Sequence, residues 1–247
     1  MPSALVAGST VGHAGSVNPA VSTFAVIVAG YLIGSVPVAG LVGARFGVEL
    51  RRSGDRNPGY WNAKVVLGRR AALPIFLGDV AKGAVAAGIG RGISDRWWVG
   101  YLAATAAMLG HAWPLFARFR GGRSILTFAG AVCVLAPIPA ALAVAACLVV
   151  SVVTRSFAWG ARLAIFGYPV IQAVFDPRAR VAATGGLMTI IGLRFVLAAR
   201  VGTTPVDSPT NAIVTSTTAN PSKATVTSRR SDGERSDRSG PATNSPA

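Results

Sequence analysis

The sequence predicts an all-α fold: a polytopic membrane helix bundle of about seven transmembrane helices over 21–200, followed by a disordered C-terminal tail. Of the 247 residues, 51% are hydrophobic and 13% are charged, whereas an ordinary soluble domain is about 25% charged. Long apolar runs recur along the chain, and most basic residues lie in the segments between them. This pattern argues against a single soluble domain. It also argues against a nucleic-acid-binding protein, whose basic residues would lie on a polar face or arm.

The first transmembrane segment is expected over 22–44, after a flexible N-terminus that covers 1–20. It is long enough for a bilayer core of about 30 Å, and Pro37 is expected to kink it. No Lys or Arg precedes Arg45. The segment therefore lacks the basic n-region of a cleavable signal and is expected to remain as an anchor.

A strongly basic loop over 45–70 leads to the second span, which is expected over about 71–90. The third span, over about 97–117, opens with two tryptophans that are typical of a membrane interface. A short loop that contains two glycines, 118–124, follows it.

The next apolar stretch, 125–153, is interrupted by Pro137 and Pro139. As one helix it would be about 44 Å long, which is more than a span requires. We therefore expect two helices, 125–136 and 138–153, of which the first needs a thinned bilayer or a cover of protein. If the stretch formed one helix instead, the bundle would have six spans and the tail would lie outside. The remaining elements are two spans and a disordered tail, expected over 157–175, 181–199 and 201–247.

The basic residues predict the orientation of the bundle. With the N-terminus outside, twelve Lys and Arg residues fall on the inner side and four on the outer side, as the positive-inside rule requires. The inner residues are Arg45, Arg51, Arg52, Arg56, Lys64, Arg69, Arg70, Arg118, Arg120, Arg123, Arg155 and Arg162. The outer residues are Arg91, Arg96, Arg178 and Arg180.

Two charged residues, Asp79 and Lys82, lie inside the otherwise apolar second span and are followed by Gly83. Charged side chains at membrane depth are costly and mark functional sites by default. Because the two residues are three apart, they share a helix face and can pair. An internal ion pair that only fixes helix packing is the structural alternative.

The loop over 118–124 reads RFRGGRS and directly precedes a helix. Its two glycines would allow backbone amides to turn towards an anion, and the helix N-terminus would add a positive dipole. The guanidinium groups of Arg120 and Arg123 could each fork onto phosphate oxygens. A generic positive-inside loop would have a similar composition.

A third polar segment, RRSGDRNPGYWN over 51–62, combines basic residues with two glycines and the amides of Asn57 and Asn62. Such a loop could bind a phosphate or a glycerol hydroxyl, or it could be a basic surface attracted to anionic headgroups. Two single residues join these motifs. His111 lies towards the inner end of the third span and could instead be an interface or packing residue, and Ser35 could simply bond back to its own helix.

The two cysteines, Cys133 and Cys147, both lie in apolar stretches. We interpret them as small buried hydrophobic residues. Their number and spacing predict neither a disulfide framework nor a metal site.

Taken together, these motifs resemble the bacterial membrane acyltransferases that use acyl phosphate to acylate glycerol 3-phosphate, over roughly 24–200. Five segments carry the resemblance in the family's order and spacing: Tyr31–Pro37, Gly54–Asn62, Asp79–Gly83, Gly110–Thr127 and Thr154–Arg155. The resemblance implies seven helices with the motifs facing the cytoplasm, in agreement with the distribution of basic residues.

By this resemblance the protein is an enzyme of the bacterial plasma membrane that makes lysophosphatidic acid for phospholipid synthesis, without a cofactor or a metal. Its implied partners are acyl phosphate, glycerol 3-phosphate and membrane lipid, with no nucleic acid, and the oligomeric state stays open. The implied catalytic residues are Asp55, His111 and Arg120. The implied substrate- and phosphate-binding residues are Ser35, Asn57, Gly59, Asn62, Lys82, Gly121, Gly122, Arg123 and Thr127.

Several positions depart from the family's pattern. Asp55 stands where the family has a serine, and Val65 stands where it has an arginine. Arg120 and Arg123 replace two lysines, which keeps the charge and changes its geometry. The third motif, a His-x-x-Asn-x-x-Arg run that ends in Gly-x-Glu, is essentially absent, because 192–202 keeps only scattered arginine and glycine.

The aspartate at position 55 can be interpreted in two ways. Asp55 could accept the hydroxyl proton as a base, but its charge would also weaken the binding of phosphates. Pairing with Arg52 or Arg56 would reduce both effects. Two other functions stay open for the chain: a catalytically degenerate relative that binds anionic lipid or a partner protein, and a small transporter, which the lack of inverted repeats disfavours.

Overall fold

The structure of the protein is a computed structural model that describes residues 18–201. Most of the flexible N-terminus and nearly all of the disordered tail expected from the sequence lie outside the described residues. The first helix begins at Pro19, so the end of the segment 1–20 is already helical.

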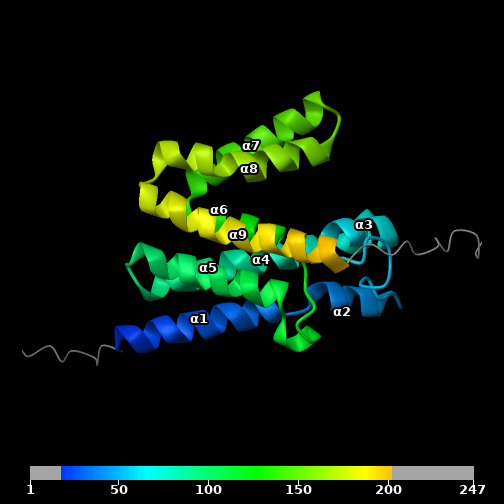
Figure 1. Ribbon diagram of the computed structural model, residues 1–247, viewed down its shortest axis with the longest axis horizontal. Coiled ribbons are helices and arrows are strands. Elements are labelled where there is room, and N and C mark those ends of the chain that lie inside the picture. Colours follow the sequence, from blue (N-terminus) through cyan, green and yellow to red (C-terminus); the bar gives the residue numbers. More distant parts are fainter. Residues whose placement is uncertain (1–17, 202–247) are drawn as a thin grey trace, which may run out of the picture. The chain divides into compact units, whose positions relative to one another are not determined.

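The described residues are all-α, as the sequence predicts, and contain no strand (Figure 1). The helices are α1 (Pro19–Ser35), α2 (Val38–Arg45), α3 (Tyr60–Leu67), α4 (Arg69–Ile93), α5 (Trp97–Ala112), α6 (Ile125–Leu135), α7 (Pro137–Val153), α8 (Phe157–Phe175) and α9 (Arg178–Val201). A short 3₁₀ turn, η1 (Leu115–Ala117), follows α5.

The division of the long apolar stretch into two helices is confirmed. The helix α6 ends at Leu135 and α7 begins at Pro137, with Ala136 between them in a non-helical conformation (φ −147°, ψ 77°). A residue before proline is disfavoured in the α conformation, whereas proline suits the first position of a helix. The proline at 137 therefore ends one helix and starts the next.

Two expectations about the first ninety residues need correction. Pro37 does not kink a continuous helix, because α1 ends at Ser35 and α2 starts at Val38. The missing N–H of Pro37 and the extended Val36 before it explain the break. The basic loop over 45–70 is also not irregular throughout, since it contains α3.

The third span is shorter than expected. The helix α5 ends at Ala112, and residues up to 117 form the connection and the turn η1. Pro114 accounts for this, because it favours an extended conformation and a helix end just before it.

Among residues 18–201, three segments are long and apolar enough to cross a membrane: Pro19–Arg45, Arg69–Ile93 and Arg178–Arg200. The helix α6 is short but has a cover of protein, with Thr127, Phe128 and Ala131 among its buried residues. Cys133, on the same helix, is exposed rather than buried as expected. The total of seven spans stays a prediction.

Small residues allow the helices to approach closely. The helix α1 lies beside α5, and α4 lies beside both α5 and α6 (Figure 1). A Cβ atom at Gly34 would collide with the carbonyl oxygen of Ala107, and one at Gly130 would collide with that of Val80. This kind of contact is typical of membrane helices, which associate by close van der Waals packing.

The connections before α3, after α5 and after α7 lie at one end of the bundle (Figure 1). Arg51 donates to the carbonyl oxygen of Ala117 (3.3 Å), and the rings of Trp61 and Phe157 are 5.1 Å apart. The connections after α4, α6 and α8 lie at the other end (Figure 1). The helices therefore alternate in direction as the distribution of basic residues predicts.

The packing between α4 and α6 predicts the effect of a single methyl group. Gly130→Ala should lower the free energy of unfolding by about 1–3 kcal/mol, the usual cost of overpacking, because backbone atoms of Val80 and Ala84 occupy the space. Gly88→Ala is the matched control, since a Cβ at Gly88 in α4 would meet nothing within 4 Å. The control should gain about 0.5–1 kcal/mol from helix propensity. Thermal unfolding in detergent measures both, and equal changes would contradict the proposed close contact.

Candidate active site

A pocket with about 300 Å³ of empty space, part of which is open solvent, lies at the end of the bundle where α1 breaks and α5 ends. Its walls come from the segment 36–40, from α4, from the end of α5 and from two loops. Three cationic side chains line it against one carboxylate: Arg51, Lys82 and Arg120 against Asp79. His111, Gly121 and Gly122 complete the polar part of the wall.

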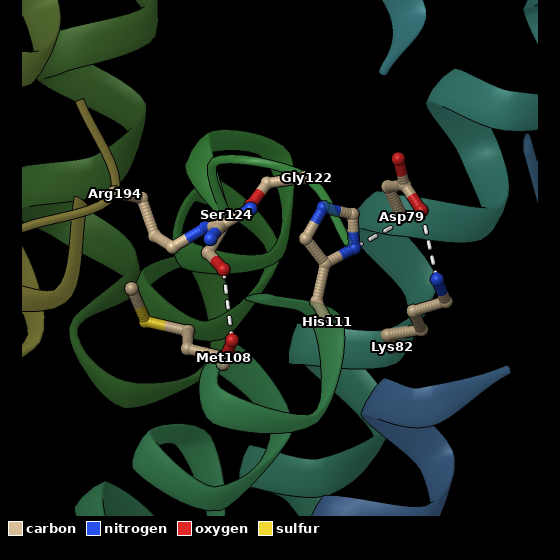
Figure 2. A network of polar contacts seen from close by, with 7 residues as sticks. All are labelled: Asp79, Lys82, Met108, His111, Gly122, Ser124 and Arg194. Carbon is tan, nitrogen blue, oxygen red and sulfur yellow. Dashed lines mark hydrogen bonds and ion pairs between the residues drawn. The ribbon is translucent and has the colours of Figure 1, made fainter. Parts of the chain in front are cut away.

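The centre of the site is a buried group of three ionisable side chains, shown in Figure 2. The Nζ atom of Lys82 donates to Oδ1 of Asp79 at 2.9 Å, and Nδ1 of His111 lies 3.4 Å from the same oxygen. The exposed fractions of Asp79, Lys82 and His111 are only 2%, 6% and 8%. The pairing of Asp79 and Lys82 expected from their spacing is thus confirmed, and α5 adds His111 to the pair.

Gly83 contributes to this site through packing. A Cβ atom there would collide with the carbonyl oxygen of Thr127 in α6. The glycine directly after Lys82 therefore allows α6 to lie against α4 and to cover the charged pair. It explains why the pattern Asp-x-x-Lys-Gly ends in a residue without a side chain.

The glycine amides of the loop over 118–124, the glycine loop that follows α5, do not have the role that the sequence predicted. The amide of Gly121 donates to the carbonyl oxygen of Ala112 (3.2 Å), and that of Gly122 donates to the carbonyl oxygen of His111 (3.1 Å). These two amides therefore do not face an anion. A Cβ at Gly122 would instead collide with Nε2 of His111, so the glycine leaves room for the imidazole ring beside the backbone.

Arg194 holds this loop from α9, and the sequence interpretation missed it. Its Nε donates to the carbonyl oxygen of Gly122 (3.0 Å) and its Nη2 to that of Gly121 (2.8 Å). Its guanidinium group also lies over the Trp113 ring, 5.1 Å from the centroid. The available signal was a charged residue inside an apolar span, which is costly unless it has partners.

Arg120 and Arg123 of this loop have separate surroundings. Arg120 is exposed and lines the pocket. Arg123 does not line it: its Nη1 lies 3.8 Å from Oδ2 of Asp55, and its guanidinium group lies 4.6 Å from the centroid of the Phe195 ring.

Asp55 pairs with neither Arg52 nor Arg56, the two residues of its own loop that could have offset its charge. Arg52 pairs with Glu49 instead (3.0 Å), and within the described residues Arg56 has no ion pair. Asp55 reaches Arg123 because the loop over 51–62 folds back onto the glycine loop.

Asn62 stabilises this conformation of the loop over 51–62. Its side-chain amide is buried and donates to the carbonyl oxygens of Leu50 (2.8 Å) and Ser53 (2.9 Å), while its Oδ1 accepts from the amide of Asp55 (3.1 Å). The amide of Asn57 in turn donates to Oδ1 of Asp55 (3.0 Å). These bonds shape the loop, which presents Arg51 and Pro58 to the pocket.

Two further expected site residues are buried inside helices. The hydroxyl of Ser35 donates to the carbonyl oxygen of Tyr31 (2.8 Å), which is the bond to its own helix that the sequence suggested. Thr127 is also buried, and its Oγ1 has no hydrogen-bond partner within the described part of the chain. Neither side chain lines the pocket.

The structure thus brings part of the expected site together. Lys82, His111, Arg120, Gly121 and Gly122 line one pocket, joined by Asp79 and Arg51. The residues that lie outside its lining are Ser35, Asp55, Asn57, Gly59, Asn62, Arg123 and Thr127.

The contacts of Arg194 predict a local effect. Arg194→Ala should increase hydrogen exchange in the glycine loop, because two carbonyl oxygens lose their donors and the loop loses its anchor to α9. Arg200→Ala, which changes an exposed arginine on the same helix, should leave exchange in the loop unchanged. Hydrogen exchange measured by mass spectrometry compares the two, and an unchanged loop in Arg194→Ala would contradict this role.

Comparison with known proteins places the fold among membrane acyltransferases. Crystal structures of PlsY (YgiH), an integral membrane glycerol 3-phosphate acyltransferase, share the fold. The glycerol 3-phosphate form matches with a TM-score of 0.65 and 23% identity, over 78% of this chain and 98% of that one. The lysophosphatidic acid form matches with a TM-score of 0.62 and 24% identity, over 70% and 87%.

Relatives in sequence carry the name glycerol-3-phosphate acyltransferase. The protein of Rubrobacter xylanophilus is 41% identical over 45% of this chain and 56% of its own length. Acyltransferase 5 of Dehalococcoides mccartyi is 34% identical over 60% and 64%, and the Bordetella pertussis protein is 39% identical over 60% and 71%. The chain thus spans between about half and two thirds of the first relatives that it matches.

The family model described as glycerol-3-phosphate acyltransferase matches residues 24–201. This match runs from α1 to the end of α9 and contains every residue of the pocket. The chain therefore belongs to the glycerol-3-phosphate acyltransferase family and is an integral membrane protein.

Proposed function

We propose that this protein transfers an acyl group from acyl phosphate to the 1-hydroxyl of glycerol 3-phosphate and so makes lysophosphatidic acid for phospholipid synthesis. The observation that supports this proposal is the pocket in which Arg51 and Arg120 join the buried Asp79–Lys82–His111 group in one wall. Membership of the family supports the reaction, and the names of the relatives support glycerol 3-phosphate as the acceptor.

The charge of the pocket suits two phosphorylated substrates. Arg51, Lys82 and Arg120 can offset the repulsion between two phosphate groups and orient them. Lys82 has three hydrogens on its ammonium group, and Asp79 accepts one of them. The other two are available to a phosphate oxygen.

The reaction needs one proton transfer. The hydroxyl oxygen of glycerol 3-phosphate attacks the acyl carbon, and the bond between that carbon and the phosphate oxygen breaks, so that phosphate leaves with the electron pair. With a hydrogen on Nδ1 directed at Asp79, a neutral His111 presents Nε2 as the proton acceptor. The departing phosphate can take the proton instead, which makes a protein base helpful but not obligatory.

The remaining expected residues have supporting roles in this proposal. Asp55 and Arg123 hold the two loops together, while Asn57, Gly59 and Asn62 keep the shape of the loop that carries Arg51. Ser35 and Thr127 pack between helices. We assign the direct contacts with phosphate to Lys82 and Arg120, beside the backbone of Gly121 and Gly122.

The proposed setting is the bacterial plasma membrane, with the pocket on the cytoplasmic side and the acyl chain between helices in the bilayer. The excess of basic residues at the pocket end of the bundle supports this orientation. In this proposal 21–200 form the catalytic membrane domain.

A second candidate is a catalytically degenerate relative that binds anionic lipid or a partner protein. The engaged amides of Gly121 and Gly122 and the placement of Asp55 beside Arg123 favour it. Such a protein would keep a cationic pocket and bind phosphate groups without turnover.

Acyl transfer by the purified protein in nanodiscs, from palmitoyl phosphate to radiolabelled glycerol 3-phosphate, tests the proposal. Arg120→Gln should raise the KM for glycerol 3-phosphate about tenfold, as expected for the loss of a charge-assisted hydrogen bond. Arg118→Gln is the matched control, because Arg118 is an exposed neighbour that does not line the pocket.

The outcomes separate the two candidates. Lysophosphatidic acid formation that responds to Arg120→Gln and not to Arg118→Gln would establish the acyltransferase. Lack of product, while a related enzyme is active in the same assay, would favour the degenerate relative.

A double variant tests whether the buried Asp79–Lys82 pair is needed for catalysis or only for the stability of the fold. Asp79→Asn should destabilise the protein by about 3–5 kcal/mol, because it leaves the ammonium group of Lys82 buried without its partner. Asp79→Asn combined with Lys82→Met removes both charges and should recover the stability while acyl transfer stays absent. Thermal unfolding and the transfer assay measure the two effects, and an active double variant would reduce the pair to a packing role.

A further inference from the structure

A second pocket, with about 530 Å³ of empty space that includes open solvent, lies at the opposite end of the bundle. It forms where α4 and α6 end and where α5 and α9 begin. Tyr101 in its wall precedes His111 of the first pocket by ten residues on α5, a separation of about 15 Å along the helix. The two pockets therefore lie at opposite ends of the bundle, and the acyl transfer proposed above is placed in the first pocket alone.

Three guanidinium groups line this second pocket. Arg91 donates from Nη1 to the carbonyl oxygen of Val134 (2.6 Å), Arg180 pairs with Asp176 (3.1 Å), and Arg96 lies over the ring of Trp98 (5.9 Å). Each guanidinium has five N–H donors, so each keeps donors that these contacts do not occupy.

The nearby negative charges are fewer. Asp95 also lines the pocket, and Asp176 is the partner of Arg180. Three arginines against two carboxylates leave an excess of one positive charge. That excess matches an anion with a single negative charge.

Tyr101 adds a hydrogen-bond donor to the pocket wall. Its side chain is 94% buried, since its exposed fraction is 6%, and its hydroxyl accepts from Nε2 of Gln172 at 3.0 Å. The same Nε2 lies 3.1 Å from Oδ2 of Asp176, which can only accept when it is ionised, so this atom is the amide nitrogen of Gln172. Within the described residues the hydrogen of the Tyr101 hydroxyl has no acceptor.

The side-chain amide of Gln172, which contacts Tyr101, is also buried at a cost in free energy. Gln172 is fully buried, and its Oε1 has no hydrogen-bond partner in the described part of the chain. Buried polar groups inside a membrane bundle are expensive and point to a function by default. Here they hold Tyr101, Asp176 and Arg180 in place around the pocket.

We propose that this pocket binds a phosphodiester group, which carries one negative charge and several acceptor oxygens. The guanidinium groups of Arg91, Arg96 and Arg180 and the hydroxyl of Tyr101 are the donors. Trp97, which also lines the pocket, is typical of the membrane interface, where the headgroup of an anionic phospholipid supplies this group. A soluble phosphodiester offers the same chemistry.

Native mass spectrometry of the full chain in detergent, titrated with phosphatidylglycerol, tests the proposal. Arg96→Gln should weaken binding about fivefold, the effect of about 1 kcal/mol per basic residue near a lipid headgroup. Tyr101→Phe, which keeps the ring and removes the hydroxyl, should weaken it about tenfold. Within the described residues the side chain of Arg96 makes no bond to the backbone of another helix, so we expect Arg96→Gln to fold. This variant tests the proposal even if Tyr101→Phe fails to fold.

A control variant locates the binding. Arg178→Gln removes an exposed charge at the same end of the bundle but outside the pocket. It should bind phosphatidylglycerol within twofold of the unmodified protein.

Competition with soluble glycerophosphoglycerol separates the two sources of the phosphodiester. Displacement of the lipid only at a large excess identifies the lipid headgroup as the ligand, and displacement at an equal concentration identifies a soluble phosphodiester. Unchanged binding by Arg96→Gln and Tyr101→Phe would overturn the proposal. An equal loss in Arg178→Gln would also overturn it, because attraction to general surface charge would then explain the binding.

Discussion

The carboxylate of Asp79 is the group around which the rest of the first pocket is arranged. One of its oxygens faces both Nζ of Lys82 and Nδ1 of His111 while all three side chains are almost fully buried. Burying a charge costs several kcal/mol unless partners with good geometry compensate it. Asp79 therefore requires α4 and α5 to meet at this level, and it also orients the imidazole and the ammonium group that the proposed chemistry needs.

Close helix packing is the condition for that arrangement. Apolar side chains alone do not drive helices together in a bilayer, so contact depends on small residues that let backbones approach. Gly83 and Gly130 provide this contact between α4 and α6, and Gly34 provides it between α1 and α5. Because Gly83 directly follows Lys82, the residue that permits close packing and the residue that needs to be covered are neighbours in the sequence.

Features with a local cause were predictable from the sequence. The break at Ala136 follows from the proline after it, and the pairing of Asp79 with Lys82 follows from helical spacing. Contacts between distant segments were not predictable. Arg194 reaches the loop at Gly122 across 72 residues, and no periodicity relates the two. The glycine amides were misjudged for the same reason, because their acceptors lie at the end of α5 and depend on how the chain turns after Pro114.

The placement of Asp55 shows how a divergent loop can remain compatible with phosphate binding. A carboxylate in place of the family's serine would oppose two phosphate groups if it lined the pocket. Asp55 instead lies outside the lining, 3.8 Å from Arg123, where its charge is offset by an arginine that also lies outside. The pocket keeps Arg51, Lys82 and Arg120 as its cations. In the proposed function the carboxylate at position 55 would therefore oppose the phosphate groups only weakly, and Arg120 would be the arginine of the glycine loop that binds them.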